Sequence, residues 1–156
     1  MANKLLKTLN SKLISIGKLT TTGTPPNEVT TGYYNFVKLG YIEDIQRLDK
    51  NSEYPCLLCI VPTFTGYNRN DTFSYTKFSL TFYIGKTWNK ETDNEFEVYD
   101  DIMETFKLFI NDLSNDAKFE VTGIDTMQVA TVPEGVTKDF ALFCKADITI
   151  KFFKDA

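Results

Sequence analysis

The strongest constraint on this fold is the alternation of apolar and polar residues near the C-terminal end of the chain. Apolar side chains occupy every second position, at Phe140, Leu142, Cys144, Ala146, Ile148, Ile150 and Phe152. The opposite face carries mostly polar residues, at Ala141, Lys145, Asp147, Thr149 and Lys151. Because successive side chains of a β-strand point to opposite faces, this pattern predicts a long strand with one buried face and one wet face. Such half-buried strands are typical of antiparallel sheets.

Other segments also carry strand patterns. Residues 77–85, KFSLTFYIG, place one apolar face at Phe78, Leu80, Phe82 and Ile84. The short apolar run in YPCLLCIVP, bounded by two prolines, predicts a buried strand. Residues 33–39 form a further strand, and residues 119–132 form a less regular one in which Gly123 marks a bulge. The stretch 41–48 fits either a helix or a strand.

Two segments have the spacing of amphipathic helices. The first apolar stripe contains Leu5, Leu6, Leu9, Leu13 and Ile16, with Asn3 as the expected N-cap and Gly17 as the expected end. The second stripe contains Phe96, Tyr99, Ile102, Met103, Phe106, Ile110 and Leu113, and Thr92 and Glu95 have the spacing of a capping box at its start. A basic amphipathic helix can also lie on a membrane, but packing on the sheet is the preferred interpretation of the first stripe.

These elements predict an α+β fold in which two amphipathic helices pack on one face of an antiparallel sheet, as a two-layer sandwich. We expect a single domain over residues 1–156, with long loops at about 17–32 and 63–74. The first loop, LTTTGTPPNEVTTG, has almost nothing to bury. Long loops inside compact domains are usually functional, so this one is a candidate contact segment.

The C-x-x-C spacing of Cys56 and Cys59 raises the question of a redox or metal site. Residues three apart in a strand point to opposite faces, with Cα atoms about 10 Å apart. That distance exceeds the roughly 7 Å limit for a disulfide. A structural zinc site needs four ligands, whereas this chain has three cysteines and no histidine. We therefore predict buried apolar thiols, with no metal and no cofactor.

The densest charge cluster consists of seven acidic residues, Glu91, Asp93, Glu95, Glu97, Asp100, Asp101 and Glu104. Carboxylates are favoured near the start of a helix, so a solvated helix face is the preferred interpretation. The lack of histidine excludes His-based acid–base chemistry, and we predict no catalytic residue and no enzymatic activity. Two alternatives stay open: a carboxylate-dependent hydrolase that uses acids between Glu95 and Asp101, and a module that binds a small ligand on its aromatic-rich sheet.

The order of these elements resembles the tail-terminator family of tailed bacteriophages, also called tail-completion or neck-ring proteins. The resemblance begins with the helix LLKTLNSKLISIG and continues through GYIEDI and YPCLLCIVP to the strand KFSLTFYIG. It then includes the helix VYDDIMETFKLFINDL and two closing strands that end in ADITIKFF. The order of elements, and no single motif, carries this resemblance. The loops at 17–32 and 63–74 depart from the most compact members.

The resemblance implies a structural virion protein of the neck or tail, assembled in the host cytoplasm. Such proteins form a homo-oligomeric ring, a hexamer or a dodecamer, next to portal, connector and tail proteins. Genomic DNA passes through the central channel without specific binding. The formal charge of −4 suits a channel through which DNA slides, and an exposed sheet edge suits strand addition between copies. No apolar stretch is long enough to predict a membrane span.

Overall fold

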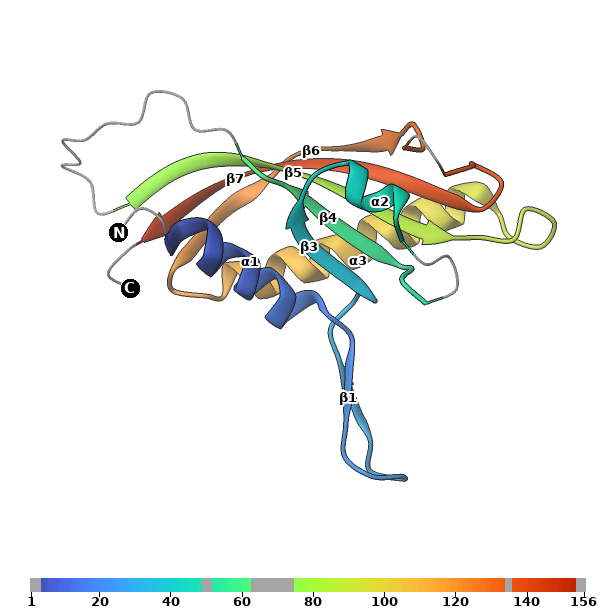
Figure 1. Ribbon diagram of the computed structural model, residues 1–156, viewed down its shortest axis with the longest axis horizontal. Coiled ribbons are helices and arrows are strands. Elements are labelled where there is room, and N and C mark those ends of the chain that lie inside the picture. Colours follow the sequence, from blue (N-terminus) through green and yellow to red (C-terminus); the bar gives the residue numbers. More distant parts are fainter. Residues whose placement is uncertain (1–3, 49–51, 63–74, 134–135, 154–156) are drawn as a thin grey trace.

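The computed structural model describes residues 4–48, 52–62, 75–133 and 136–153 (Figure 1). Within these ranges five strands form one sheet in the order β3-β4-β5-β7-β6, and β1 and β2 form a separate two-stranded ribbon. The combination of sheet and helices confirms the predicted α+β class. In chain order the elements are α1 (Lys4–Gly17), β1 (Thr20–Thr22), β2 (Val29–Thr31), β3 (Phe36–Gly40), α2 (Glu43–Gln46), β4 (Cys56–Ile60), β5 (Tyr75–Thr87), α3 (Glu95–Ser114), β6 (Phe119–Ala130) and β7 (Ala141–Phe153).

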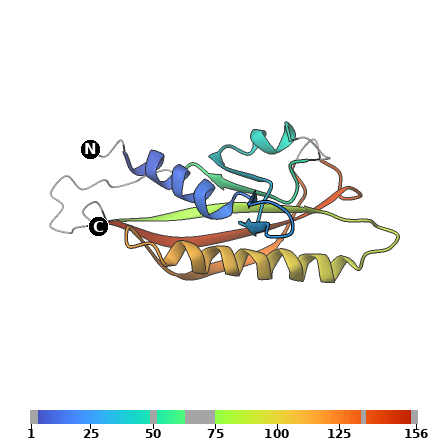
Figure 2. The ribbon, with the colours of Figure 1, turned by 90° about the horizontal axis from the view of Figure 1, so that it is seen from below.

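Helices α1 and α3 cover the same face of the large sheet. In Figure 2, where the molecule is seen from below, both lie in front of the strands, with α1 against β3 and α3 against β6 and β7. Leu9 and Leu13 of α1 are fully buried in the same core as Phe106 and Phe109 of α3. The apolar stripes of the two helices therefore pack where the sequence predicts.

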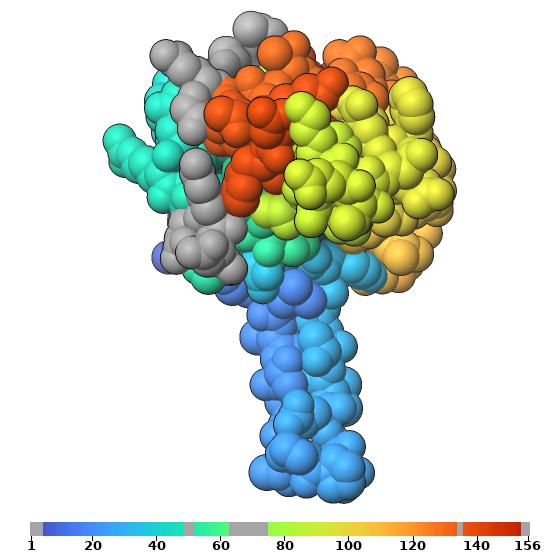
Figure 3. Space-filling model, turned by 90° about the vertical axis from the view of Figure 1, so that its right-hand side faces the viewer, coloured from blue at the N-terminus to red at the C-terminus, as the bar shows by residue number. Residues whose placement is uncertain are grey.

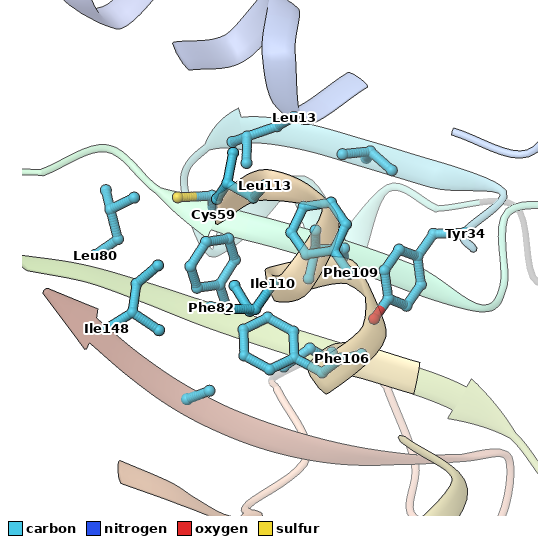
Figure 4. Close-up of a cluster of buried hydrophobic side chains, with 14 of the residues drawn as sticks. Leu13, Tyr34, Cys59, Leu80, Phe82, Phe106, Phe109, Ile110, Leu113 and Ile148 are labelled. Carbon is cyan, nitrogen blue, oxygen red and sulfur yellow. The ribbon is translucent and has the colours of Figure 1, made fainter. Parts of the chain in front are cut away.

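The main core is built around a cluster of aromatic rings (Figure 4). The ring of Phe82 on β5 lies 5.1 Å from that of Phe106, and Phe106 stacks on Phe109 at 6.1 Å. Leu80 and Ile148 extend this cluster along the neighbouring strands β5 and β7. Since each fully buried side chain of this size contributes about 1.5–3 kcal/mol relative to exposure, this layer supplies much of the fold's stability.

Strand β7 has the alternation that its sequence predicts, but its second face is drier than expected. Leu142, Cys144, Ala146, Ile148, Ile150 and Phe152 all lie in the main core. Phe143 is fully buried on the opposite face, in a smaller core with Ile45 of α2 and Leu58 of β4. Gly85 pairs with Phe143, and a Cβ at Gly85 would lie 2.5 Å from the Phe143 ring. The prediction of one wet face therefore fails at this end of β7, because α2 and the segment before β4 cover it.

The prediction of an all-antiparallel sheet is wrong at its first strand. Strand β3 pairs with β4 in parallel, with Phe36 opposite Cys56 and Gly40 opposite Ile60. The connection between them, residues 41–55, contains α2, which settles the ambiguous stretch 41–48 as a short helix. A parallel pair needs such a crossover of about a dozen or more residues, whereas the other paired strands of this sheet run antiparallel.

The ends of the two long helices only partly match the predicted signals. Helix α1 ends at Gly17 as expected, while the expected cap Asn3 lies outside the described residues. Helix α3 is capped by Asn94 and not by Thr92, because the Asn94 side-chain oxygen accepts hydrogen bonds from the Phe96 and Glu97 amides at 3.0 and 3.3 Å. The predicted capping box is therefore wrong by two residues.

Two further sequence predictions have definite outcomes. Phe96, predicted in the buried stripe of the second helix, is 75% exposed, whereas Val98 and Tyr99 in the same part of the helix lie in the main core. The bulge predicted at Gly123 is present, since the register of β6 on β7 shifts between Val121 and Ile124. The predicted loop at 63–74 lies outside the described residues.

Candidate functional site

Three acidic residues of α3 form separate surface ion pairs. Glu95 Oε1 lies 2.8 Å from Lys138 Nζ, and this hydrogen bond holds the pKa of Glu95 below its ordinary value. Asp101 pairs with Lys86 at 3.3 Å, and Glu104 pairs with Lys107 at 3.2 Å. These three carboxylates have three different basic partners. Such pairs stabilise the charged form of each carboxylate. Within the same cluster, Asp93, Glu97 and Asp101 line one surface hollow of about 160 Å³ together with Lys86.

The described residues offer neither a metal site nor a membrane-spanning helix. In the described ranges no three Cys, Asp or Glu side chains gather closely enough to hold a metal ion. Over those ranges, no helix has both the length and the apolar character needed to cross a bilayer. Among the described residues the fully buried positions are apolar or aromatic, without a charged member.

The cysteines lie where the strand geometry predicts. Cys59 faces the main core under α1 and α3, while Cys56 faces the smaller core on the other side of the sheet. Cys56, Cys59 and Cys144 are all fully buried. Burial raises the pKa of the Cys56 thiol to about 12 and that of Cys144 to about 11, and it raises the pKa of Cys59 further. The thiols are therefore held in the protonated, unreactive form.

The native protein is expected to leave all three thiols unmodified by a thiol-specific disulfide reagent at neutral pH. The reagent attacks thiolates, and these thiols are both protonated and shielded from solvent. In denaturant three thiols per chain should react. The measurement is the absorbance of the released chromophore, with a Val29→Cys variant as the control, since Val29 is 58% exposed. Rapid reaction of any native cysteine would contradict this burial.

The most unusual feature of the molecule is a hairpin that stands clear of the sheet and helices (Figures 1 and 3). We call it the threonine arm, residues 19–32. Its strands β1 and β2 pair antiparallel, with Thr20 opposite Thr31 and Thr21 opposite Thr30. The two hydroxyl oxygens of the second pair lie 3.0 Å apart. Every residue from 20 to 31 is exposed, so the arm buries none of its side chains on its own body.

The root of the arm, in contrast, is firmly attached. The amides of Tyr33 and Tyr34 both donate to the Gly17 carbonyl at 2.8 Å. The Tyr34 ring is buried against Phe109 of α3, with centroids 5.9 Å apart. The hydroxyl of Tyr33 donates to the Asp112 carboxylate, which raises the pKa of Tyr33 to about 12. These contacts from α1 and α3 fix the direction in which the arm leaves the body.

A glycine makes this close attachment possible. Gly32 has a φ of +93°, a region that side chains strongly disfavour. A Cβ at this position would also lie 2.2 Å from the Lys18 carbonyl oxygen. The segments around Lys18 and Gly32, which form the root of the arm, can therefore lie side by side only with glycine at position 32.

Comparison of this chain with protein-family models, with curated proteins and with solved structures finds no match.

The threonine arm corrects the predicted loop at 17–32. Residues 20–22 and 29–31, predicted as part of a loop and a candidate contact segment, form the two strands of a hairpin. The available signal was the pair of β-branched runs, TTT and VTT, on either side of the turn sequence GTPPN. The turn is closed by a hydrogen bond from the Asn27 amide to the Thr24 carbonyl at 2.7 Å.

The face of β5 and β7 that the long helices leave open is polar and internally hydrogen-bonded. The Asp147 carboxylate accepts from Thr81 at 2.6 Å and from Thr126 at 2.9 Å. The Lys151 ammonium lies 4.8 Å from the centroid of the Tyr75 ring. This face thus carries charges of both signs, which distinguishes it from the uniformly basic surfaces that bind nucleic acids through phosphate neutralisation.

Proposed function

We propose that this chain is a structural subunit of a tailed-bacteriophage neck or tail, and that copies of it assemble into a ring around a DNA channel. In this role it is a virion protein without catalytic activity. Its partners are its own copies, in a hexamer or a dodecamer, and the neighbouring portal, connector and tail proteins. The ring either terminates the tail or joins it to the head, and DNA passes through the channel without specific binding.

The threonine arm is the observation that carries this proposal. Fixing the backbone of one residue costs about 1–2 kcal/mol, and twelve consecutive arm residues are ordered without burying a side chain. The cross-strand pairs of the arm contribute only about 0.2–1 kcal/mol each. An isolated two-stranded hairpin is marginally stable in water. A contact with another molecule supplies the missing stabilisation, as expected for a subunit that works in an assembly.

Two further features support the proposal. The order of helix, sheet strands, second helix and two long closing strands is the order on which the resemblance to tail-terminator proteins rests. The net charge of −4 suits a channel from which DNA is repelled and along which it slides.

The first test is the mass and shape of the purified full-length protein. Size-exclusion chromatography with light scattering is expected to give an assembly of six or twelve chains, and negative-stain microscopy should show rings with a central hole. The measurement needs no partner protein, because the proposed contact lies between copies.

Two results would overturn the proposal. One is a protein that stays monomeric at every concentration its solubility allows. The other is a closed dimer without larger species, since a two-fold contact uses up its own surface and cannot continue around a ring.

A further inference from the structure

The two edges of the large sheet differ in how far other parts of the described chain cover them. At the β3 edge the side chain of Asn10 on α1 accepts a hydrogen bond from the Leu39 amide at 3.0 Å. Helix α1 therefore occupies part of that edge. Strand β6 forms the other edge, is twelve residues long and, within the part of the chain that the structure describes, is paired only on its β7 side. Its outward amides and carbonyls are the ordinary template for the addition of another strand.

Protection of the β6 edge is limited to its first half. Around Gly123 the register on β7 shifts twice, and Glu120 and Asp125 place charges in this part of the strand. Residues 126–130 pair with β7 in unbroken register and have the uncharged sequence TMQVA. Natural proteins block edge strands with bulges and charges, and this second half has neither. We call residues 126–130 the open edge.

The open edge lies next to a surface hollow of about 420 Å³. The hollow is lined by Tyr99, Val129, Ala130, Thr131, Val132 and Lys138. Val129 belongs to both the edge and the hollow, and its side chain is 52% exposed. A strand added at the open edge would therefore find an apolar side chain beside it and space in which to place another.

The threonine arm has the matching properties. Its outer strand edges carry no strand partner within the described residues, and Glu28 is its only charged residue. Val29 on β2 is 58% exposed and is the only large apolar side chain among its two strands. The two strands of the arm thus carry only uncharged, β-branched side chains, one of which is Val29. The open edge is likewise uncharged and exposes Val129.

The arm of a chain points away from that chain's own open edge. It leads into β3, whereas β6 is at the opposite end of the strand order. Figures 1 and 3 show the arm extending from one side of the body while β6 and the segment after it lie on the other. Pairing between the two must therefore take place between molecules.

We infer that the threonine arm of one copy adds as a strand to the open edge of the next copy, with Val29 packed beside Val129. This inference rests on the proposed function, because it names the contact that joins neighbouring subunits of the ring. Each chain has one donor at the β3 end of its sheet and one acceptor at the β6 end. Such a head-to-tail contact generates a ring when its rotation closes.

Cross-linking tests this contact directly in the full-length protein. The double variant V29C/V129C, treated with a short bismaleimide, is expected to give covalent dimers, trimers and larger species up to the ring. Cross-strand neighbours have Cβ atoms about 4.5–5.5 Å apart, well within reach of the reagent. The native cysteines do not interfere because they are buried. The matched control is V29C/L108C, since Leu108 on α3 is 54% exposed but lies away from the open edge.

The outcomes separate this inference from the proposed function. Equal cross-linking of the test and control variants, in samples that light scattering shows to be rings, overturns the arm contact and leaves the ring intact. Monomers in the same samples overturn both. Covalent dimers without larger species mean a two-fold contact and overturn the head-to-tail arrangement.

A charge at the open edge gives an independent measurement. Val129→Lys is expected to weaken self-association about tenfold or more, which corresponds to about 1.4 kcal/mol, because lysine on an edge strand opposes strand addition. Leu108→Lys, with the same new side chain at equal exposure, should associate as the unchanged protein does. Equal association of the two variants would overturn the inference.

Discussion

Replacing Ile148 with aspartate is expected to abolish folding of the whole chain. Ile148 is fully buried in β7, with Leu80 of β5 on one side and Ile124 of β6 on the other. Removing such a side chain costs about 2–5 kcal/mol, and burying an unpaired carboxylate adds several more. The sum approaches the roughly 5–15 kcal/mol that stabilises an ordinary domain. Far-ultraviolet circular dichroism and solubility measure the result.

The control for Ile148→Asp places the same side chain on the open face of the sheet. Lys77 on β5 is exposed and lies opposite Lys151 on β7, so Lys77→Asp introduces a carboxylate beside an ammonium group. This variant should fold with nearly unchanged thermal stability. A folded, soluble Ile148→Asp protein would show that this face of β7 is not the core.

Removal of the threonine arm is expected to abolish assembly and leave the fold intact. Thr20 and Thr31 are paired at the base of the hairpin, so a short glycine linker can replace residues 20–31 without moving the root. The deleted residues are all exposed and contribute no side chain to either core. Circular dichroism and thermal unfolding should match those of the full chain, while light scattering should report monomers.

A second variant separates loss of the arm from a change in its charge. Glu28→Gln keeps the hairpin and removes its only charge, so it should assemble as the unchanged protein does. Rings formed equally well by the arm-deleted protein would reduce the arm to a linker. An unfolded deletion variant would instead show that the arm supports its own body.

Local sequence patterns predicted most of the individual elements. The alternation in 77–85 and in the last strand depends only on which neighbours are apolar, and the buried faces of β5 and β7 follow it from Phe78 to Ile84 and from Leu142 to Phe152. The stripes of α1 and α3 were equally local, as was the bulge at Gly123. The cysteines could be assigned to opposite faces of the sheet because a strand alternates its side chains.

The features that the sequence did not predict depend on contacts between residues that are distant along the chain. Phe96 stays exposed because no described part of the fold packs on its side of the first turn of α3, whereas Val98 in the same turn is buried. Whether β3 runs parallel to β4 depends on the path of residues 41–55 over the sheet. Phe143 is buried because Ile45 of α2 and Tyr54, both distant in sequence, pack in the same small core.

The sequence by itself determined the spacing of the apolar residues along the chain. That spacing determines the helices, the long strands and the face that each of them buries. Periodicity is a property of neighbours along the chain, and it survives without knowledge of the rest of the fold. The tertiary structure alone decided that the threonine-rich hairpin points away from the body, at the edge of the sheet opposite to β6. That placement depends on Tyr33 and Tyr34 packing against α1 and α3, which are distant in sequence and adjacent only after folding.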